Sequence, residues 1–456
     1  MLTKKEGHVL IVKLFILYMG ISLSLFANIS IGNAWYSVEK QNDALKASTA
    51  DIHHAQLKKE SAEGMYLPSV SLIGSYTHLD DAINLDTSGV SGLLASLPIP
   101  IAFPSEIDFL DQDIALVDLQ VLYPLYVGGK IDAAQDAYSA KVAEAKAKHR
   151  IAKDKAFLQL IKLYYGVVVT KSLYHTRVES EKALKLHYSN AKKLKKEGQI
   201  SRVELLNARV KLDMAKIETK KALQKMEIVT SALYTMIKRK QMPSSKLFVS
   251  KKIGTKDQYS TQSTEAYAAI DVLNAKSQQA SAMIEVEEAA WYPEVLGYAN
   301  VNLHKGDSPF EELAPQWMIG VGVKFDLFSR KDRAKEVEAA KVLRSKVDAL
   351  TVQAKDDLRL AVKKTYDEIM LYRDEFNSLS TSLVLARENY KLRSLAFKEG
   401  LATSVEVVDA QTLLRGAKAQ RLNAAYNYVK SLAALCVLSG ERERFFTFEK
   451  SGKGIR

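Results

Sequence analysis

The sequence predicts a mainly α-helical chain with membrane β-strands, built from two duplicated helix–strand–strand–helix halves. Three observations indicate this class: a motif repeated at a constant offset, long segments with apolar residues every three or four positions, and four short alternating segments. The chain has 456 residues, 47% hydrophobic and 26% charged, which excludes a disordered protein. Its nine prolines are absent from 125–242 and from 316–456, so very long helices are permitted there.

The first 34 residues have the features of an export signal. Three early lysines precede an apolar run at 14–26, and residues 32–34 have the small-x-small form that signal peptidase accepts. The alternative is a membrane anchor, but a 13-residue run is shorter than the roughly 20 residues that a spanning helix needs. We therefore expect residues 1–34 to be a cleaved signal peptide.

A turn motif divides the rest of the chain into two halves. Lys-Glu-Gly occurs twice, 202 residues apart, and ends at Gly198 and Gly400. Each glycine can take the left-handed conformation that ends a helix, and the capping box that follows starts a new helix. Each half therefore contains a helical hairpin with a tight tip. The predicted boundaries are a first half at 35–240 with its tip at 198–201, a linker at 241–264, a second half at 265–440 with its tip at 400–403, and a tail at 441–456.

The long segments before the two tips predict paired helices. From Val337 to Leu379, thirteen apolar positions are separated by steps of three or four, with a mean step of 3.5. This heptad spacing is typical of helices that pack along one another. The matching segment at 130–197 is rich in alanine, which permits close helix approach. A helix of about 65 residues would be about 100 Å long.

Four shorter segments alternate with period two and predict β-strands. Each is close to the roughly 9–11 residues that a tilted strand needs to cross a bilayer, and aromatic residues gather at the strand ends. The alternative is a soluble sheet packed on helices. Between the first two strands, residues 78–111 form an insert containing three prolines, which we expect to be a long loop. The predicted strands are 66–78, 113–126, 294–304 and 317–328.

The strand count predicts assembly. Four strands cannot close a membrane barrel, whose smallest form has about eight, and an open edge in lipid leaves backbone groups unpaired. The missing strands must come from other copies of the chain. Three copies would supply twelve strands, and the helical hairpins would continue as a twelve-helix tube.

These features resemble the TolC outer-membrane efflux family. The likeness rests on the duplicated halves, the paired Lys-Glu-Gly turns, and the strand exits Leu-Tyr-Val-Gly-Gly-Lys at 125–130 and Asp-Leu-Phe-Ser-Arg at 326–330. The resemblance implies a homotrimer with a 12-stranded β-barrel in the outer membrane and a long α-helical barrel in the periplasm. It further implies a passive efflux or secretion channel that docks to a periplasmic adaptor and an inner-membrane pump.

The resemblance also implies a gate at the periplasmic end. Residues 405–409 match the family stretch that carries a ring of carboxylates, which assigns gate or selectivity roles to Glu406 and Asp409. Because these residues are three apart, they share one helix face, and three copies would gather six carboxylates around one axis. The alternative for Glu406 is that it only caps its helix.

The chain departs from the family at the latch that closes this entrance. In the family a Tyr and an Arg near the second turn bond to an acidic residue of the first hairpin. The matching residues here are Phe397, Ala402 and Glu204, and the first two have neither hydroxyl nor charge. Packing of Phe397, or pairing of Arg202 or Lys398 with carboxylates, would then hold the entrance. The alternative is that these are solvated tip residues.

The sequence indicates no enzyme. The one cysteine, Cys436, excludes a disulfide framework and a cysteine-rich metal site, and we find no nucleophile–base arrangement. We expect no cofactor or metal, since no residues have the spacing of a binding motif. We also expect no nucleic acid, because the formal charge of +12 is mixed with 53 acidic residues along the chain. The alternative function is a soluble periplasmic coiled-coil adaptor or scaffold that never enters lipid.

Overall fold

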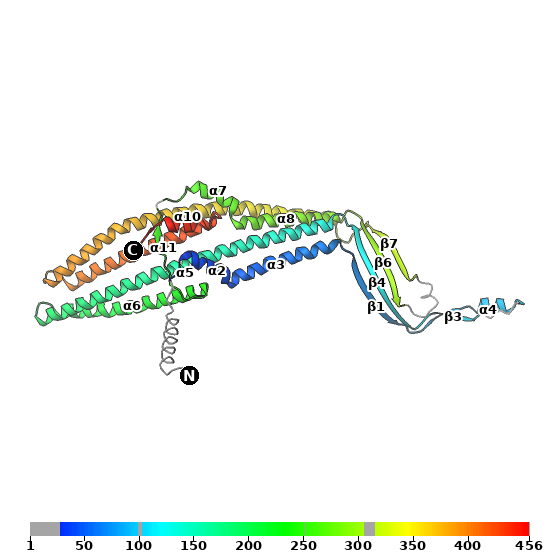
Figure 1. Ribbon diagram of the computed structural model, residues 1–456, viewed down its shortest axis with the longest axis horizontal. Helices are drawn as coiled ribbons and strands as arrows, with labels where there is room; N and C mark the ends of the chain where they lie inside the picture. The colour runs from blue at the N-terminus through cyan, green and yellow to red at the C-terminus, as the bar shows by residue number, and fades with distance from the viewer. Residues whose placement is uncertain (1–27, 99–102, 251, 305–314, 456) are drawn as a thin grey trace, which may run out of the picture. The chain divides into compact units, whose positions relative to one another are not determined.

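The computed structural model describes residues 28–98, 103–250, 252–304 and 315–455, and it confirms the predicted fold class (Figure 1). The basic start and the apolar run of the predicted signal lie outside the described residues. The chain divides into two compact units. The first consists of Met1–Ile52, Ala145–Val272 and Thr351–Arg456, and the second of His53–Glu144 and Leu273–Leu350.

Long helices account for most of the described chain. None of these helices combines the length and hydrophobicity needed to cross a bilayer. The helices are α2 (Ile31–Gln41), α3 (Asp43–Glu63), the 3-10 turn η1 (Gly64–Tyr66), α4 (Ser88–Ala95), α5 (Lys130–Lys196), α6 (Arg202–Ile237), α7 (Lys256–Ala266), α8 (Ala268–Ala289), α10 (Arg333–Lys398), α11 (Ser404–Leu438) and α12 (Arg444–Ser451).

Both long helices end in the same backbone motif. Gly198 and Gly400 have φ of 77° and 74°. After α5, the N–H of Gln199 donates to the Leu194 carbonyl (2.9 Å) and the N–H of Gly198 to the Lys195 carbonyl (3.1 Å), and the equivalent pair of bonds closes α10. This pattern satisfies the last helical carbonyls and turns the chain by left-handed backbone that a side chain would strain. Two hairpins result, α5–α6 and α10–α11 (Figure 1).

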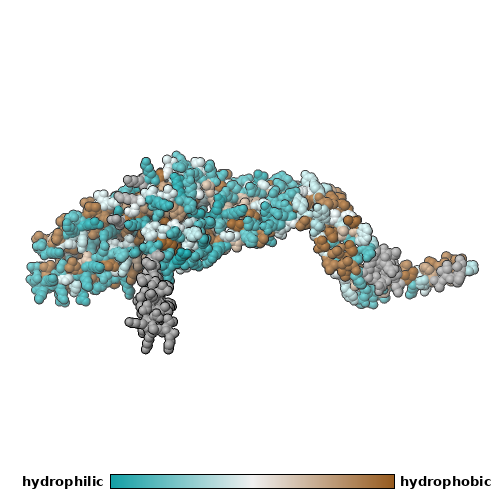
Figure 2. Space-filling view, viewed as in Figure 1, coloured by the Kyte–Doolittle hydropathy of each residue, from teal (hydrophilic) through white to brown (hydrophobic). Residues whose placement is uncertain are grey.

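The second unit contains a four-stranded antiparallel sheet in the order β1-β4-β6-β7. Two strands come from each half, and β4 pairs with β6 across the duplication. Hydrophobic side chains cover the strand region in Figure 2, and every residue of β1 is exposed. In the described part of the chain, β1 and β7 are edge strands. The strands are β1 (Ser69–His78), β4 (Asp113–Tyr126), β6 (Glu294–His304) and β7 (Trp317–Lys324).

The insert between β1 and β4 is more ordered than the predicted loop. Strands β2 (Ile83–Asp86) and β3 (Glu106–Leu110) pair antiparallel, and α4 lies between them in sequence. The insert at 79–112 contains six acidic residues, and no Lys or Arg occurs anywhere from 60 to 129. The insert is therefore an acidic, partly folded arm of a chain that is basic overall.

The core of the first unit joins segments that are far apart in sequence. The Phe157 ring of α5 makes edge-to-face contacts with Trp35 of α2 (5.3 Å between centroids) and with Phe445 of α12 (5.6 Å). Phe445 also contacts Phe248 of the short strand β5 (Phe248–Val249), which pairs with β8 (Lys453–Gly454). Such aromatic pairs contribute about 0.5–1.5 kcal/mol each beyond their buried area. The predicted linker and tail thus pack into the core.

A buried tyrosine holds the N-terminal segment against the same core. The Tyr164 hydroxyl donates to the Ile29 carbonyl (2.6 Å) and accepts from the N–H groups of Ser244 (3.2 Å) and Ser245 (3.0 Å). The N–H of Ile29 donates to the Met242 carbonyl (2.9 Å). Burial raises the pKa of Tyr164, so the hydroxyl keeps its proton. Ile29 is therefore an integral part of the fold.

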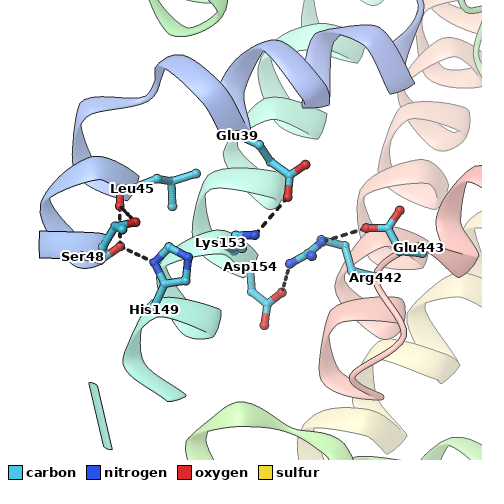
Figure 3. A network of polar contacts seen from close by, with 9 residues as sticks. Glu39, Leu45, Ser48, His149, Lys153, Asp154, Arg442 and Glu443 are labelled. Atoms are coloured by element: carbon cyan, nitrogen blue, oxygen red, sulfur yellow. Dashed lines mark hydrogen bonds and ion pairs between the residues drawn. The ribbon is translucent and has the colours of Figure 1, made fainter. Parts of the chain in front are cut away.

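Ion pairs connect the chain after α11 to α5, and α5 to α2 (Figure 3). Arg442 bonds to Asp154 of α5 at 2.9 Å, and its guanidinium lies 5.1 Å from the centre of the Trp35 ring. Burial raises the pKa of Asp154, while Arg442 opposes that shift. Beside this pair, Lys153 contacts Glu39 at 3.3 Å, and His149 lies 2.7 Å from the hydroxyl of Ser48.

The buried position of Ile29 favours a signal peptide that ends before this residue, earlier than the expected end at residue 34. Cleavage after Ala34 would cut within α2 and remove the cap residue Ser30, whose side chain accepts from the N–H of Asn33. It would also remove Ile29 and Ile31, which are 3% and 1% exposed. We propose that the mature chain begins no later than Ile29. N-terminal sequencing of the exported protein should show this start, and a mature chain that begins at Trp35 would contradict it.

Candidate functional site at the hairpin tips

The two helical hairpins of the first unit share a side-by-side interface. The Gln411 side chain of α11 donates to the Ser180 carbonyl of α5 (3.2 Å), and Lys418 pairs with Glu179 at 2.9 Å. Closer to the tips, the contact becomes apolar through a cluster that contains residues of α5, α6 and α11. Its buried members are Leu184, Leu212, Ala215 and Val408. The interface thus passes from polar to apolar along its length.

At the tips, four side chains connect the hairpins directly. We call His187, Glu204, Phe397 and Ser404 the hairpin clasp. One residue comes from each of the helices α5, α6, α10 and α11. His187, Phe397 and Ser404 are 6%, 2% and 1% exposed, although they lie within about four helical turns of solvent-exposed hairpin ends. The clasp is therefore a small core of its own.

Glu204 links the beginnings of α6 and α11. Its N–H donates to the Ser201 hydroxyl (3.2 Å), as the predicted capping box requires, but its carboxylate does not complete that box. The carboxylate Oε2 instead accepts from the N–H of Ser404 (3.1 Å), the first residue of α11. A carboxylate at a helix N-terminus interacts favourably with the helix dipole. The acidic residue of the first hairpin thus bonds to backbone of the second.

His187 and Phe397 form the apolar part of the clasp. Their ring centroids are 4.5 Å apart, and the His187 Nε2 lies 2.5 Å from the Ser404 hydroxyl oxygen. Phe397 packs further on Ala191, Ala208 and Val407. Burial lowers the pKa of His187 to about 4, so the ring is neutral at pH 7. Phe397, which has no hydroxyl, is therefore held at this position by the packing of its buried ring.

The two predicted gate carboxylates have different surroundings. Glu406 is already paired within its own chain: Oε2 accepts from the N–H of Thr403 (2.9 Å) and Oε1 bonds to Arg393 (3.2 Å). Its capping box with Thr403 is complete. Asp409 is exposed and lines a groove of about 820 Å³ between α10 and α11. Within the described chain, the Asp409 carboxylate has no hydrogen bond or ion pair.

The remaining predicted tip residues lie outside the clasp. Arg202 is exposed at the start of α6, and no ion pair joins it to a described residue. Lys398 is also exposed and lines a cavity of about 310 Å³ beside His187. No group of three or more His, Cys, Asp or Glu side chains within the described ranges is arranged to hold a metal ion.

Sequence reasoning missed His187 and Ser404. One signal was present: His187 stands between Leu184 and Ala191 at heptad spacing, in a position where the neighbouring seam residues are apolar and buried. A histidine at such a position needs a polar partner for its ring nitrogens. That partner, Ser404, lies 217 residues away and could not be identified without the fold.

Comparison with known proteins shows that the fold is shared with outer membrane proteins. A profile of the outer membrane efflux protein family matches residues 263–441. The fold is similar to the outer membrane protein VceC of Vibrio cholerae, with TM-score 0.72, 14% identity, and coverage of 90% of this chain and 96% of VceC. A search of curated protein sequences finds no match.

Two outer membrane channels give similar results. CmeC of Campylobacter jejuni has TM-score 0.71 and 15% identity, with 92% of this chain and 89% of CmeC covered. The open state of MtrE of Neisseria gonorrhoeae has TM-score 0.69 and 16% identity, with 91% of this chain and 90% of MtrE covered. At these identities the likeness concerns the fold.

The Glu204 bond can be tested in solution. Glu204→Ala removes the acceptor of the Ser404 N–H and a favourable charge at the start of α11, which together contribute about 1–2 kcal/mol. We expect amide hydrogen exchange in the first turn of α11 to become about tenfold faster, as measured by mass spectrometry. The matched control is Glu197→Ala, an exposed acidic residue on the same tip. Equal exchange in the two variants would contradict the assignment.

Proposed function

Because residues 263–441 carry an outer membrane efflux protein domain within a channel-type fold, we propose that three copies of this chain form a passive export duct. The duct crosses the outer membrane as a 12-stranded β-barrel and continues through the periplasm as a helical barrel. It is coupled to a periplasmic adaptor and an inner-membrane pump, which supply the energy. The entrance is at the hairpin tips, where the clasp holds each pair of hairpins together.

The four-stranded sheet is the observation that carries this proposal. Hydrophobic side chains are exposed along its strands, including Leu72 (65%), Ile319 (75%) and Val323 (68%). The edge strands β1 and β7 are unpaired within the described chain, and unpaired backbone groups in lipid cost several kcal/mol each. Strands from neighbouring copies would satisfy both edges. A soluble adaptor would expose this apolar sheet to water, which favours aggregation.

An apolar stripe on α6 supports contact between copies. Its members are roughly half exposed and repeat at steps of three or four, on the side of α6 opposite the buried residues Ala208, Leu212 and Ala215. That spacing is typical of a helix packed against another helix. A second copy of the chain is the partner that a helical barrel would supply. The stripe consists of Val203, Leu206, Val210, Met214 and Ile217.

The charge of the first hairpin tip supports a separate docking role. Residues 182–211 contain nine Lys or Arg and only two acidic residues. Such a surface attracts an acidic protein partner and accelerates encounter with it. We assign this tip to the adaptor contact. The acidic part of the entrance is then Asp409, one carboxylate per copy, because Glu406 is neutralised by Arg393.

Planar-bilayer recording tests the duct. The detergent-purified chain should be a trimer and should give discrete ion conductance, since a closed barrel encloses a continuous pore. Asp409→Asn should lower the cation-over-anion permeability ratio by about twofold or more, because it removes an unpaired charge from each copy. Glu406→Gln is the matched control and should change the ratio less. A soluble monomer without conductance would exclude the duct.

Substitutions on the α6 stripe test the contact between copies. The double variant Met214→Gln and Ile217→Gln should weaken each interface by about 2 kcal/mol, because it removes apolar area that association buries. Light scattering in detergent should then detect dissociation at a higher protein concentration than for the unaltered trimer. The control pair Lys211→Gln and Lys216→Gln alters polar residues beside the stripe. Equal dissociation of the two double variants would show that the stripe is not part of the interface.

A further inference from the structure

The hairpin clasp contains a single titratable ring at its centre. His187 is 6% exposed, its Nε2 is 2.5 Å from the Ser404 hydroxyl oxygen, and its ring packs against Phe397. We propose that protonation of His187 opens the clasp and separates the second hairpin tip from the first, so that closure of the duct entrance depends on pH. This inference rests on the proposed function, because only a duct makes the tips an entrance.

The packing explains why the clasp requires a neutral ring. An imidazolium in this position would lose its hydration without gaining an ionic partner, which is costly in a buried site. The Ser404 hydroxyl is a neutral partner. The carboxylate of Glu204 accepts from the Ser404 N–H and makes no hydrogen bond to the ring. Protonation is therefore favoured only when the ring moves into water, which breaks its contacts with Phe397 and Ser404.

The charged groups around the ring provide no ionic partner for an imidazolium. Three cations of α10, Arg387, Lys391 and Lys398, line the cavity beside His187, together with Tyr390. On α6 the acidic group at the clasp is Glu204, and on α11 it is Glu406, whose charge is paired with Arg393. These α10 cations are exposed, and Lys391 is paired with Glu388 at 3.6 Å, so burial is the cause of the lowered pKa of His187.

The expected size of the effect follows from linkage. Burial lowers the pKa of His187 to about 4 in the closed clasp, whereas an exposed histidine has its ordinary value near 6.5. A lowered pKa means that protons bind the open state more tightly, so the clasp is stable above about pH 6.5 and weakens as pH falls toward 4. At pH 5.5 these values favour opening by about tenfold over pH 7.5.

Thiol labelling can measure opening without a transport assay. Val407 is buried against Phe397, and Val405 is exposed two residues earlier on the same helix. Each valine is replaced by cysteine in a separate variant, Val407→Cys or Val405→Cys. The native Cys436 gives no background, because it is fully buried and burial raises the pKa of its thiol to about 12. A methanethiosulfonate reagent then labels detergent-purified protein between pH 5.5 and 7.5.

The labelling rate of Val407→Cys is divided by that of Val405→Cys, which removes the intrinsic pH dependence of the thiol reaction. We expect this ratio to rise about tenfold from pH 7.5 to 5.5. His187→Gln should abolish the rise, and so should His187→Phe, which preserves ring packing. His175→Gln, at an exposed histidine on the same helix, should leave the rise unchanged. A constant ratio in the chain with native His187, or a rise that persists in both His187 variants, would overturn the proposal.

Bilayer recording separates this proposal from the duct itself. Conductance that is accompanied by a pH-independent labelling ratio would overturn proton-dependent opening and leave the duct intact. A pH-dependent ratio without any conductance would overturn the duct, while the histidine would still control the contact between the hairpins.

Discussion

Backbone hydrogen bonding is the constraint on which the rest of this structure depends. The long helices satisfy their own N–H and C=O groups, and the glycine turns close their last carbonyls. The sheet satisfies its inner strands but leaves β1 and β7 with one unpaired side each in the described chain. In the proposed trimer, strands of neighbouring copies supply the missing pairs. The exposed apolar sheet and the α6 stripe agree with that requirement, since both are costly in an isolated monomer.

Much of the fold could be predicted from local patterns. The heptad spacing and the two Lys-Glu-Gly turns located the long helices and their tips, because helix periodicity and glycine conformation act within a few residues. The predicted strand ends differ from the observed ones by a few residues. The strand β7 stops at Lys324, short of the predicted 328, because its partner β6 begins opposite at Glu294. The order in the insert was missed because its paired strands β2 and β3 have only four and five residues. The packing of the tail was missed because β8 pairs with β5, which is distant in sequence.

The contacts of the clasp depend on tertiary structure, which local sequence patterns do not determine. Capping chemistry predicted two equivalent boxes, yet only Glu406 stays at its own cap, while Glu204 bonds to the other hairpin. The difference arises from tertiary position, because α11 begins beside Glu204. The packing of Phe397 likewise depends on a distant residue, because its ring lies against His187 of the other hairpin. The hairpins are thus linked by the Glu204 carboxylate, by the contact of His187 with the Ser404 hydroxyl and by ring packing.

The lysine-free stretch from 60 to 129 has a practical consequence for topology mapping. Trypsin has no cleavage site within it, so β1, the acidic arm and β4 would leave a digest as one 71-residue fragment, residues 60–130, larger than routine peptide sequencing detects. Amine-reactive reagents applied to whole cells would also pass over the arm, even if it projects from the cell surface. Carbodiimide coupling to its aspartates is the chemistry suited to reveal it.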